Sequence, residues 1–320
     1  MEIGKLYPTL ADRKTGRTAL MPQLQTVVLT GATSGLGRLA AISLARRGFR
    51  LALPARDEQK AAETRSEIEA AAPAALVGIH LGDLSRMEDV RRVGTEIRER
   101  YERIDVLINN AGLHAFEQRA TLDGYPQMVA VNYLAPFLLT VTLLPALRGA
   151  TPSRIVNVAS EASRRHGTLA LPGDLTDTTP FTARGSSAVY GKTKLMNIMF
   201  TMELARRLAG TGITVNALDP GFNVTGLGRE LRFAAPLERV LKSLRIGDPR
   251  RGSGLIVDLA TAPEFSRETG AYVTARGRKR ITPSAPGDDP AMQRELWDAT
   301  TALLERPARA EPSGAGAGAA

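Results

Sequence analysis

Short apolar segments rich in β-branched residues alternate with segments of helical periodicity along most of this chain. The expected strands are Thr26–Thr30, Arg50–Ala55, Ala75–Leu81, Asp105–Asn109, Arg154–Ala159 and Thr214–Leu218. The expected helices are Leu36–Arg47, Glu58–Ala72, Ser85–Tyr101, Val129–Leu147 and Ala188–Leu208. Strict alternation predicts an α/β fold: a single-domain, doubly wound parallel sheet of the Rossmann type with helices on both faces. Such sheets bind ligands at the carboxyl ends of their strands.

A glycine-rich turn joins the first expected strand to the first expected helix. Its spacing, Gly31-x3-Gly35-x-Gly37, differs from that of the most widespread dinucleotide fingerprint. Glycine lets the backbone turn tightly and approach a pyrophosphate, and the helix N-terminus that follows favours an anion. A plain tight turn is the alternative, but we expect a bound dinucleotide. The contacting turn residues would be Gly31, Thr33, Ser34, Gly35, Leu36 and Gly37.

Tyr190 and Lys194 stand four residues apart in an expected helix, so their side chains lie on one face. A free tyrosine has a pKa near ~10 and moves protons poorly at neutral pH. A cation at ~4 Å, in an effective dielectric of ~20, supplies roughly the 4 kcal/mol that lowers such a pKa by about three units. We expect a proton-transfer pair in which Lys194 lowers the pKa of Tyr190.

The composition excludes several classes of site. The chain has no cysteine, and its three histidines, His80, His114 and His166, lack ligand spacing, so a metal site is not expected. The net charge of +9 fits either a nucleic-acid or membrane surface, or an arginine-rich background with a pocket for phosphates. Basic residues are dispersed among acidic ones, as in Arg91–Arg100, so we expect no nucleic-acid partner.

The chain divides into three expected regions. A domain at residues 26–306 lies between an N-terminal extension at 1–25 and a Pro/Gly/Ala-rich tail at 307–320 that we expect to be disordered. The extension has no apolar core of signal-peptide length. Met128–Leu147 has the length of a membrane span, but it contains Asn132 and two prolines and lies between two expected strands. A buried crossover helix is favoured over a transmembrane span.

The ordered set of motifs resembles the short-chain dehydrogenase/reductase family over roughly Thr26–Arg306. The matching features are the glycine turn, Asp83, Asn109-Asn110-Ala111-Gly112, Asn132, Ser160, Tyr190-x3-Lys194 and Pro220-Gly221-x3-Thr225. The chain is most similar to the retinol dehydrogenase-like branch, because the gap from Ser160 to Tyr190 is long and Arg294–Trp297 looks like that branch's C-terminal helix. Light-driven protochlorophyllide reductases look similar around Pro220, but their pattern uses cysteines.

The resemblance implies a role for each matched residue. Tyr190 would donate a proton to a carbonyl or accept one from an alcohol, and Lys194 would bind the nicotinamide ribose and lower the pKa of Tyr190. Ser160 would hydrogen-bond the substrate oxygen, and Asn132 would hold a water that links Lys194 to solvent. Ala159 replaces a serine found in many relatives, which should not abolish the site. The other residues implied to contact the cofactor are Asp83, Leu84, Asn110, Ala111, Gly112, Pro220, Gly221 and Thr225.

Four of the polar residues have a second interpretation. Ser160 could be only a cap at the end of a strand, and Asn132 a mid-helix residue with local hydrogen bonds. Asp83 could cap the helix that follows it, alone or together with a cofactor role. His114, just past the Asn-Asn-Ala-Gly motif, could line the substrate cavity or lie in a surface loop.

The end of the second expected strand bears on cofactor choice. Ala55 occupies the position where NAD-preferring members of such folds place an acid, and Arg56 follows it. The arginine fork suits a 2′-phosphate, because it forms charge-assisted hydrogen bonds. Asp57 is expected to cap the next helix and point elsewhere. NADP(H) is therefore favoured over NAD(H).

Two segments are expected to wall a substrate pocket. The lid, at residues 226–248, has apolar residues at helical spacing beside basic ones. A substrate lid, a membrane-surface helix and a plain packed helix all account for that pattern. The insert Gly167–Arg184 adds Leu169, Leu171 and Phe181. Both segments should meet above Tyr190, which favours a lipophilic or polycyclic substrate.

These features predict an NADP(H)-dependent oxidoreductase that transfers a hydride between its cofactor and a lipophilic carbonyl or alcohol. The alternative is a catalytically idle NADP(H)-binding regulatory protein on the same fold, against which the intact Ser160–Tyr190–Lys194 set argues. We expect a cytoplasmic protein. Peripheral contact with a membrane and homo-oligomerisation both stay open.

Overall fold

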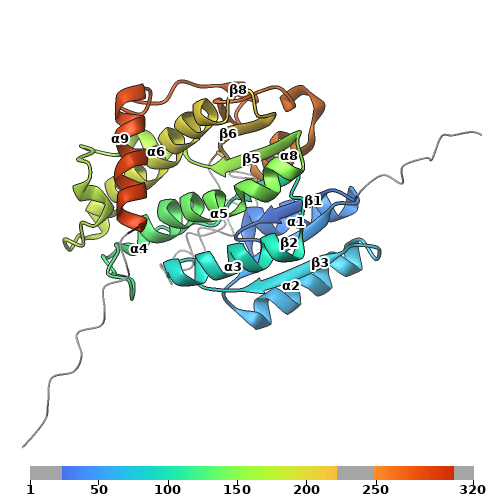
Figure 1. Cartoon of the computed structure of the whole chain (residues 1–320). Coiled ribbons are helices and arrows are strands. Elements are labelled where there is room, and N and C mark those ends of the chain that lie inside the picture. The colour runs from blue at the N-terminus through green and yellow to red at the C-terminus, as the bar shows by residue number, and fades with distance from the viewer. Residues whose placement is uncertain (1–23, 222–247, 306–320) are drawn as a thin grey trace, which may run out of the picture.

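The computed structural model describes residues 24–221 and 248–305, and one eight-stranded sheet forms its centre (Figure 1). The strand order is β3-β2-β1-β4-β5-β6-β7-β8, and among these strands only β8 runs antiparallel to its neighbour. Their bounds are β1 Thr26–Leu29, β2 Arg50–Ala55, β3 Val77–Leu81, β4 Val106–Asn109, β5 Ser153–Val158, β6 Ile213–Asp219, β7 Tyr272–Thr274 and β8 Lys279–Arg280. The expected Rossmann-type sheet is confirmed. Its strand order reverses between β1 and β4, where such sheets bind ligands.

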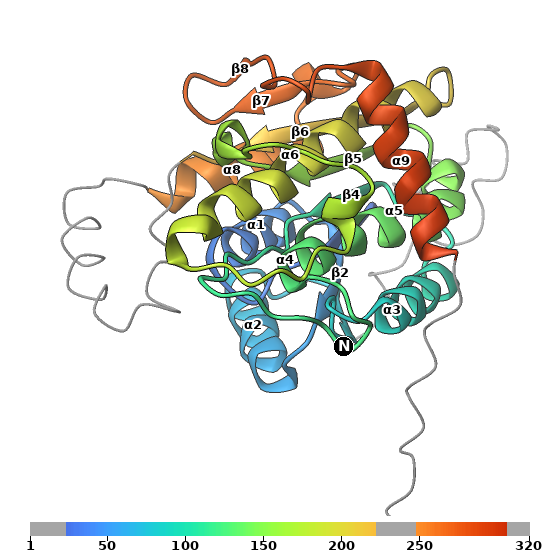
Figure 2. The same ribbon diagram turned by 90° about the vertical axis from the view of Figure 1, so that its left-hand side faces the viewer.

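Helices cover both faces of the sheet (Figure 2). One face carries α1 (Gly35–Arg46), α2 (Glu58–Ala71) and α8 (Pro249–Thr261). The other carries α3 (Met87–Arg100), α5 (Ala135–Gly149) and α6 (Ala183–Arg207), and α9 (Pro290–Leu304) packs against α6. The short elements are α4 Gln127–Val129, a π-helical turn Ala130–Leu134, and the 3-10 turns Glu161–Arg165, Gly173–Leu175 and Pro263–Phe265.

The alternation of side chains along β1 divides the core into two layers. Val27 and Leu29 are buried with residues of α1 and α8, whereas Val28 is buried with residues of α3 and α5. Because both faces of β1 are covered, its four residues are all buried. This explains why the strands appear in the sequence as continuous apolar runs.

The most apolar stretch is a crossover between β4 and β5. Among the described helices, Gln127–Gly149 is long and apolar enough to cross a membrane by length and composition, but 72% of its most apolar window is buried. It starts as α4, passes through the π-helical turn and continues as α5, which packs against α3. Its burial between other elements matches the expected core helix.

The C-terminal part contains elements that the alternation did not predict. α8 comes after β6 in the chain and packs on one face of the sheet. β7 extends the sheet beside β6, and β8 pairs antiparallel with β7. The helix expected around Arg294–Trp297 is present as α9. α6 begins at Ala183, before its expected start at Ala188, so it includes the end of the insert.

Several expected features lie outside the described residues. They are the extension before Leu24, nearly all of the lid, Thr225 and the tail at 307–320.

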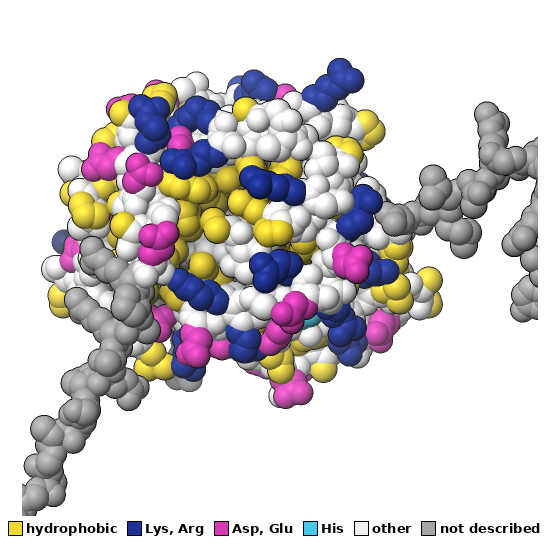
Figure 3. All heavy atoms as spheres, in the orientation of Figure 1, with side chains coloured by type: hydrophobic (Ala, Val, Ile, Leu, Met, Phe, Trp, Pro, Cys, Tyr) yellow, Lys and Arg dark blue, Asp and Glu magenta, His cyan; other side chains and the backbone are white. Residues whose placement is uncertain are grey.

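Lysine and arginine side chains are interleaved with aspartate and glutamate on the face shown in Figure 3, around apolar side chains gathered near its centre. This face therefore offers no single basic patch of the kind that follows a nucleic-acid backbone.

Candidate active site

The glycine turn between β1 and α1 packs against the loop that follows β4. Asn110 Nδ2 donates to the carbonyl oxygens of Thr30 and Gly31 at 2.9 and 3.2 Å. Thr30 Oγ1 accepts the backbone N–H groups of Asn110 and Ala111, both at 3.0 Å. Gly31 has a φ of +68°, and a Cβ on Gly37 would lie 2.1 Å from the Gly31 carbonyl oxygen. Both positions therefore require glycine, and the two motifs form one unit.

The N-terminus of α1 suits an anion. Its N-cap residue, Ser34, makes no side-chain cap bond within the described chain, and the first turn carries no carboxylate. In contrast, α2, α8 and α9 each begin at an aspartate whose side chain accepts a backbone N–H. Backbone N–H groups at the positive end of a helix are the donors that a pyrophosphate needs. These residues therefore fit a dinucleotide, which Gly35, Leu36 and Gly37 would hold.

Arg56 lies just past the end of β2, at the same edge of the sheet. Its side chain is 70% exposed, and its Nη1 lies 3.9 Å from Asp83 Oδ2. Asp83 Oδ1 accepts the backbone N–H of Ser85 at 2.9 Å, whereas α3 begins only at Met87. Asp83 therefore closes a local turn and does not cap α3. Asp57 caps α2, as expected.

Leu84, Pro220 and Gly221 also lie in loops after the carboxyl ends of strands. Leu84 is half-buried and packs against the core formed by α3, α5 and α6. Pro220 and Gly221 directly follow β6, and Gly221 has a φ of +75°. All three are therefore at the edge of the sheet that carries the glycine turn.

Tyr190 and Lys194 share one face of α6, as their spacing predicts. Lys194 Nζ lies 5.7 Å from the centre of the Tyr190 ring and donates to the carbonyl oxygen of Val158, the last residue of β5, at 2.9 Å. A Cβ on Gly112 would lie 3.3 Å from this Nζ, so the loop after β4 closes over the same amino group. α6 thus holds the phenol and the amine beside the carboxyl ends of β4 and β5.

The expected lowering of the Tyr190 pKa is not observed. Burial, with a contribution from the charge of Asp219, raises the pKa of Tyr190 to about 12. Burial also lowers the pKa of Lys194 to about 8. The prediction assumed a cation at ~4 Å from the phenol. In the structure the ammonium donates to a backbone carbonyl, and both groups have lost water. Desolvation therefore outweighs the attraction between the two groups in this structure.

Ser160 follows β5 at the same edge. Its Oγ accepts the backbone N–H of Ala162 at 3.1 Å and so caps the turn Glu161–Arg165. Asp219, the last residue of β6, accepts the Glu161 N–H and the Thr274 hydroxyl, both at 3.0 Å. The Ser160 turn is thereby tied to β6 and β7. Capping and substrate binding are compatible, because a hydroxyl accepts one hydrogen bond while donating another.

Asn132 lies in the π-helical turn and is fully buried. Its Oδ1 accepts the Leu113 N–H at 2.8 Å, and its Nδ2 donates to the Leu113 carbonyl at 2.9 Å and to Thr193 Oγ1 at 3.0 Å. Its backbone carbonyl accepts Asn197 Nδ2 at 2.8 Å. Both amide protons are therefore used by the protein, and a water could approach Asn132 only at the remaining oxygen lone pairs. These contacts join the loop after β4 to α6.

The insert after Ser160 is anchored to the protein body. Leu169 is buried and Leu171 half-buried against the core formed by α3, α5 and α6. Lys192 Nζ on α6 donates to Asp174 Oδ1 at 2.5 Å. Both leucines were expected to wall a substrate pocket with Phe181, but their side chains pack onto the core. Phe181 is half-buried near the start of α6.

His114 is half-buried in the loop after β4 and lies beside Tyr190. The two rings stack with centroids 4.7 Å apart and planes 16° apart. The imidazole is therefore part of the candidate active site.

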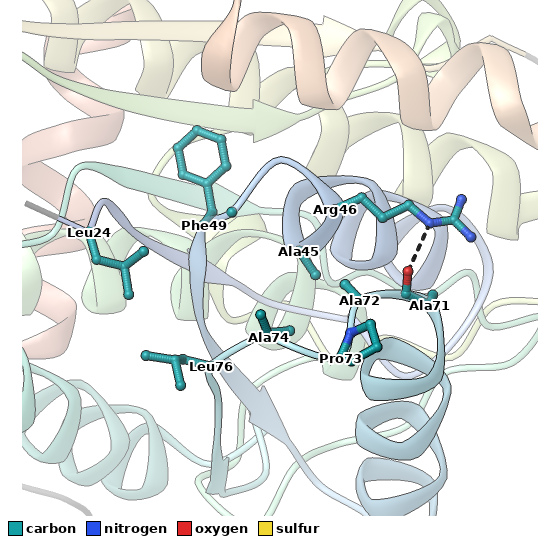
Figure 4. A pocket seen from close by; sticks show the side chains of 11 residues that line it. Leu24, Ala45, Arg46, Phe49, Ala71, Ala72, Pro73, Ala74 and Leu76 are labelled. Carbon is teal, nitrogen blue, oxygen red and sulfur yellow. Dashed lines mark hydrogen bonds between the residues drawn. The ribbon is translucent and has the colours of Figure 1, made fainter. Parts of the chain in front are cut away.

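A separate hollow of about 300 Å³ lies at the opposite edge of the sheet (Figure 4). Small and apolar side chains line most of it, among them Leu24, Phe49 and Leu76, and Arg46 Nε donates to the Ala71 carbonyl at its rim. None of the residues of the candidate active site lines it. The chemistry is therefore assigned to the polar cluster around Tyr190.

Comparison with known proteins agrees with this geometry. Residues 25–171 match the short chain dehydrogenase family. Retinol dehydrogenase 14 of Mus musculus is 35% identical over 88% of this chain and 86% of its own length, and that of Homo sapiens is 36% identical with the same coverage. The chain belongs to the short-chain dehydrogenase family. Its similarity to these relatives places it in the retinol dehydrogenase-like branch of that family.

Other relatives of this short-chain dehydrogenase broaden the comparison. DnrU of Streptomyces sp. (strain C5), whose name gives it a proposed daunorubicin C-13 ketoreductase activity, is 35% identical over 89% of this chain and 94% of its own length. A crystal structure from Mycobacterium paratuberculosis has a TM-score of 0.69 at 28% identity, with 89% of this chain and 95% of that chain covered. The Pseudomonas aeruginosa RhlG/NADP complex has a TM-score of 0.61 at 25% identity, with 78% and 94% covered.

The site of this short-chain dehydrogenase also depends on residues for which no role was predicted. Thr30 joins the glycine turn to the loop after β4, Thr193 holds Asn132, and Asp219 supports the Ser160 turn. Thr30 and Asp219 stand directly before Gly31 and Pro220, so their positions in the motifs could have identified them. Thr193 gives no such signal, because its role depends on the contact between α6 and the π-helical turn.

The depressed pKa of Lys194 predicts a pH-dependent stability. The unfolded chain would hold the Lys194 proton up to its ordinary pKa of 10.5, whereas the folded protein releases it at about 8. The free energy of unfolding should therefore rise with pH across this interval. Relative to Lys194→Met, it should rise by about 2 kcal/mol from about pH 7 to about pH 9.5. Urea unfolding of both proteins measures this, and a constant difference would contradict the burial of an ionisable amine.

Proposed function

We propose that this short-chain dehydrogenase is an NADP(H)-dependent oxidoreductase that interconverts a lipophilic carbonyl compound and its alcohol. The proposal rests on one observation: Tyr190, Lys194 and Ser160 are grouped around the carboxyl end of β5, at the sheet edge that carries the glycine turn. A proton donor, a cation and a hydroxyl beside an anion-binding turn suit reduction of a carbonyl group. Hydrolysis is less favoured, because the hydroxyl of Ser186, which pairs with His114 at this site, donates its proton to the Ala183 carbonyl.

Tyr190 would move the proton. Reduction of a carbonyl places negative charge on its oxygen, which requires a positioned acid and a hydrogen-bond donor. The pKa of about 12 keeps Tyr190 protonated at neutral pH, so it can serve as the acid. Lys194, with a pKa of about 8, carries its proton at neutral pH and would stabilise the phenolate that remains. The Ser160 hydroxyl would orient the substrate oxygen.

The dinucleotide, when bound, supplies the hydride, and the protein orients it. The first-turn N–H groups of α1 would bind the pyrophosphate, and Arg56 the 2′-phosphate. Two similar structures support NADP(H), namely the RhlG/NADP complex and a blue fluorescent protein from a metagenomic library in complex with NADPH, each 25% identical to this chain. Arg56 at the end of β2 is the reason for preferring NADP(H) to NAD(H) in this chain.

The names of the relatives support a lipophilic substrate. Retinol is a long apolar alcohol, and daunorubicin is a polycyclic ketone. If the pocket of this protein is apolar, kcat/KM along a series of 2-alkanones should increase about fourfold per methylene until the pocket is full. Steady-state assays with NADPH test this. A flat series, or a preference for short charged ketones, would contradict the apolar pocket and leave the reductase assignment intact.

The alternative is an NADP(H)-binding regulator without turnover. A screen separates the two: NADPH with ketones, aldehydes and quinones, and NADP⁺ with alcohols, each monitored by absorbance at the nicotinamide band. Consumption of NADPH with any carbonyl class supports the enzyme. Tight NADPH binding without turnover on the whole panel would favour the regulator.

We further propose that the protein works in the cytoplasm. Cell fractionation tests this location, and it also tests peripheral contact with a membrane. Light scattering on the purified protein tests homo-oligomerisation.

A further inference from the structure

The imidazole of His114 contacts two aromatic rings at the active site. It stacks on Tyr190, with centroids 4.7 Å apart and an interplanar angle of 16°. It also contacts Phe116, with centroids 5.0 Å apart and an angle of 37°. His114 and Phe116 belong to the loop after β4, and Tyr190 belongs to α6. The stack therefore joins the loop of the cofactor-side motif to the helix of the proton donor.

A hydrogen bond fixes the imidazole to the same helix. His114 Nε2 lies 3.1 Å from Ser186 Oγ. The Ser186 hydroxyl donates its only proton to the Ala183 carbonyl at 2.8 Å, so it must accept from His114. This assigns the proton of the imidazole to Nε2. The Ala183 carbonyl, in the first turn of α6, therefore determines that His114 is the donor and Ser186 the acceptor.

Ser186 and Tyr190 are four residues apart on α6, so the bond and the stack act on one face of one rigid element. Ser186 is fully buried, which holds the anchor in place. A phenol on a helix can rotate about its side-chain torsions, and a ring stacked on its face restricts that rotation. The position of the Tyr190 hydroxyl depends on those same torsions.

We propose that His114 is a positioning residue for the phenol of Tyr190, held by Ser186 and acting through the face-to-face stack. The proposal deepens the proposed function, on which it rests for its kinetic consequence. Substrate and cofactor need not touch His114 for this role. Loss of the stack would leave the acid present but poorly oriented, which lowers the rate of proton transfer without weakening cofactor binding.

Three variants test the proposal. His114→Ala removes ring and hydrogen bond, His114→Phe keeps a ring for stacking, and Ser186→Ala removes the anchor. We expect His114→Ala to lower kcat about tenfold, with KM and the NADPH Kd within about twofold of the unaltered protein. His114→Phe should recover most of kcat, and Ser186→Ala should fall between the two. His166→Ala, at a half-buried histidine whose Nε2 lies 3.0 Å from the Ala285 carbonyl oxygen and whose ring has no contact with Tyr190, is the matched control and should leave kcat unchanged.

A second readout does not depend on turnover. In protein labelled with ¹³Cζ-tyrosine, the Tyr190 resonance is identified by its loss in Tyr190→Phe. Removal of the stacked ring in His114→Ala should shift this resonance, and His114→Phe should shift it less. An unmoved resonance in His114→Ala overturns the stack. A kcat within about twofold of the original for His114→Ala, or one equally low for His114→Phe, overturns the positioning role. Absence of turnover in the unaltered protein would instead count against the proposed function, while the resonance still tests the stack.

Discussion

Replacement of Tyr190 by phenylalanine is expected to lower kcat/KM about 10²–10⁴-fold, the range typical of losing a general acid–base residue. The ring, its stack on His114 and the fold should all remain, because only the hydroxyl is removed. NADPH affinity should change little, because the glycine turn and Arg56 are untouched. Steady-state kinetics with NADPH and a reducible ketone, together with a cofactor titration, measure both effects.

The matched control is Tyr101→Phe. Tyr101 follows α3 and is also buried, but its ring packs edge-on against His80 of β3, with centroids 5.9 Å apart. This variant should keep its turnover. Near-full activity of Tyr190→Phe would mean that another group moves the proton and that the mechanism is wrong.

Arg56→Ala is expected to weaken NADPH binding about 10–150-fold and NADH binding far less. The range corresponds to losing one charge-assisted contact, about 1.5–3 kcal/mol. Only NADPH carries the 2′-phosphate that the guanidinium would bind, and the 3.9 Å pair with Asp83 leaves Arg56 largely exposed to receive it. Fluorescence titrations with both cofactors give the ratio of Kd values.

Arg103→Ala is the control for this change of charge. Arg103 is exposed just before β4, at the amino edge of the sheet, so its loss alters the net charge equally without touching the carboxyl edge. It should leave both Kd values unchanged. Equal weakening of NADPH and NADH in Arg56→Ala would remove Arg56 from cofactor selection.

The strands and helices that have a clear hydrophobic pattern in the sequence were predicted correctly. The first six strands and the crossover helices were expected within a few residues, because apolar alternation and helical periodicity are properties of short segments. β7 and β8 are too short to produce such a pattern, and their conformation comes from pairing with β6 and with each other. The early start of α6 at Ala183 likewise went unpredicted.

Some features of the candidate site could likewise be predicted from the sequence, and others depend on the folded structure. Spacing placed Tyr190 and Lys194 on one face of α6, and the glycine positions marked the turn that only glycine can form. Spacing could not give the sign of the Tyr190 pKa shift, since burial by the whole fold decides it. Nor could it place His114 on Tyr190, because the loop after β4 and α6 are distant in the chain and meet only in the folded protein.

Hydride transfer itself is the central claim, and isotopic labelling measures it directly. The protein would be incubated with a ketone and NADPH that carries deuterium at the transferable position, and the alcohol analysed by mass spectrometry and NMR. We predict an alcohol with one deuterium, bound to the carbinol carbon in a single configuration. Tyr190→Phe should form almost none of this deuterated alcohol. An alcohol without deuterium, or the same yield from Tyr190→Phe, would contradict the assignment of this site as a carbonyl-reducing centre.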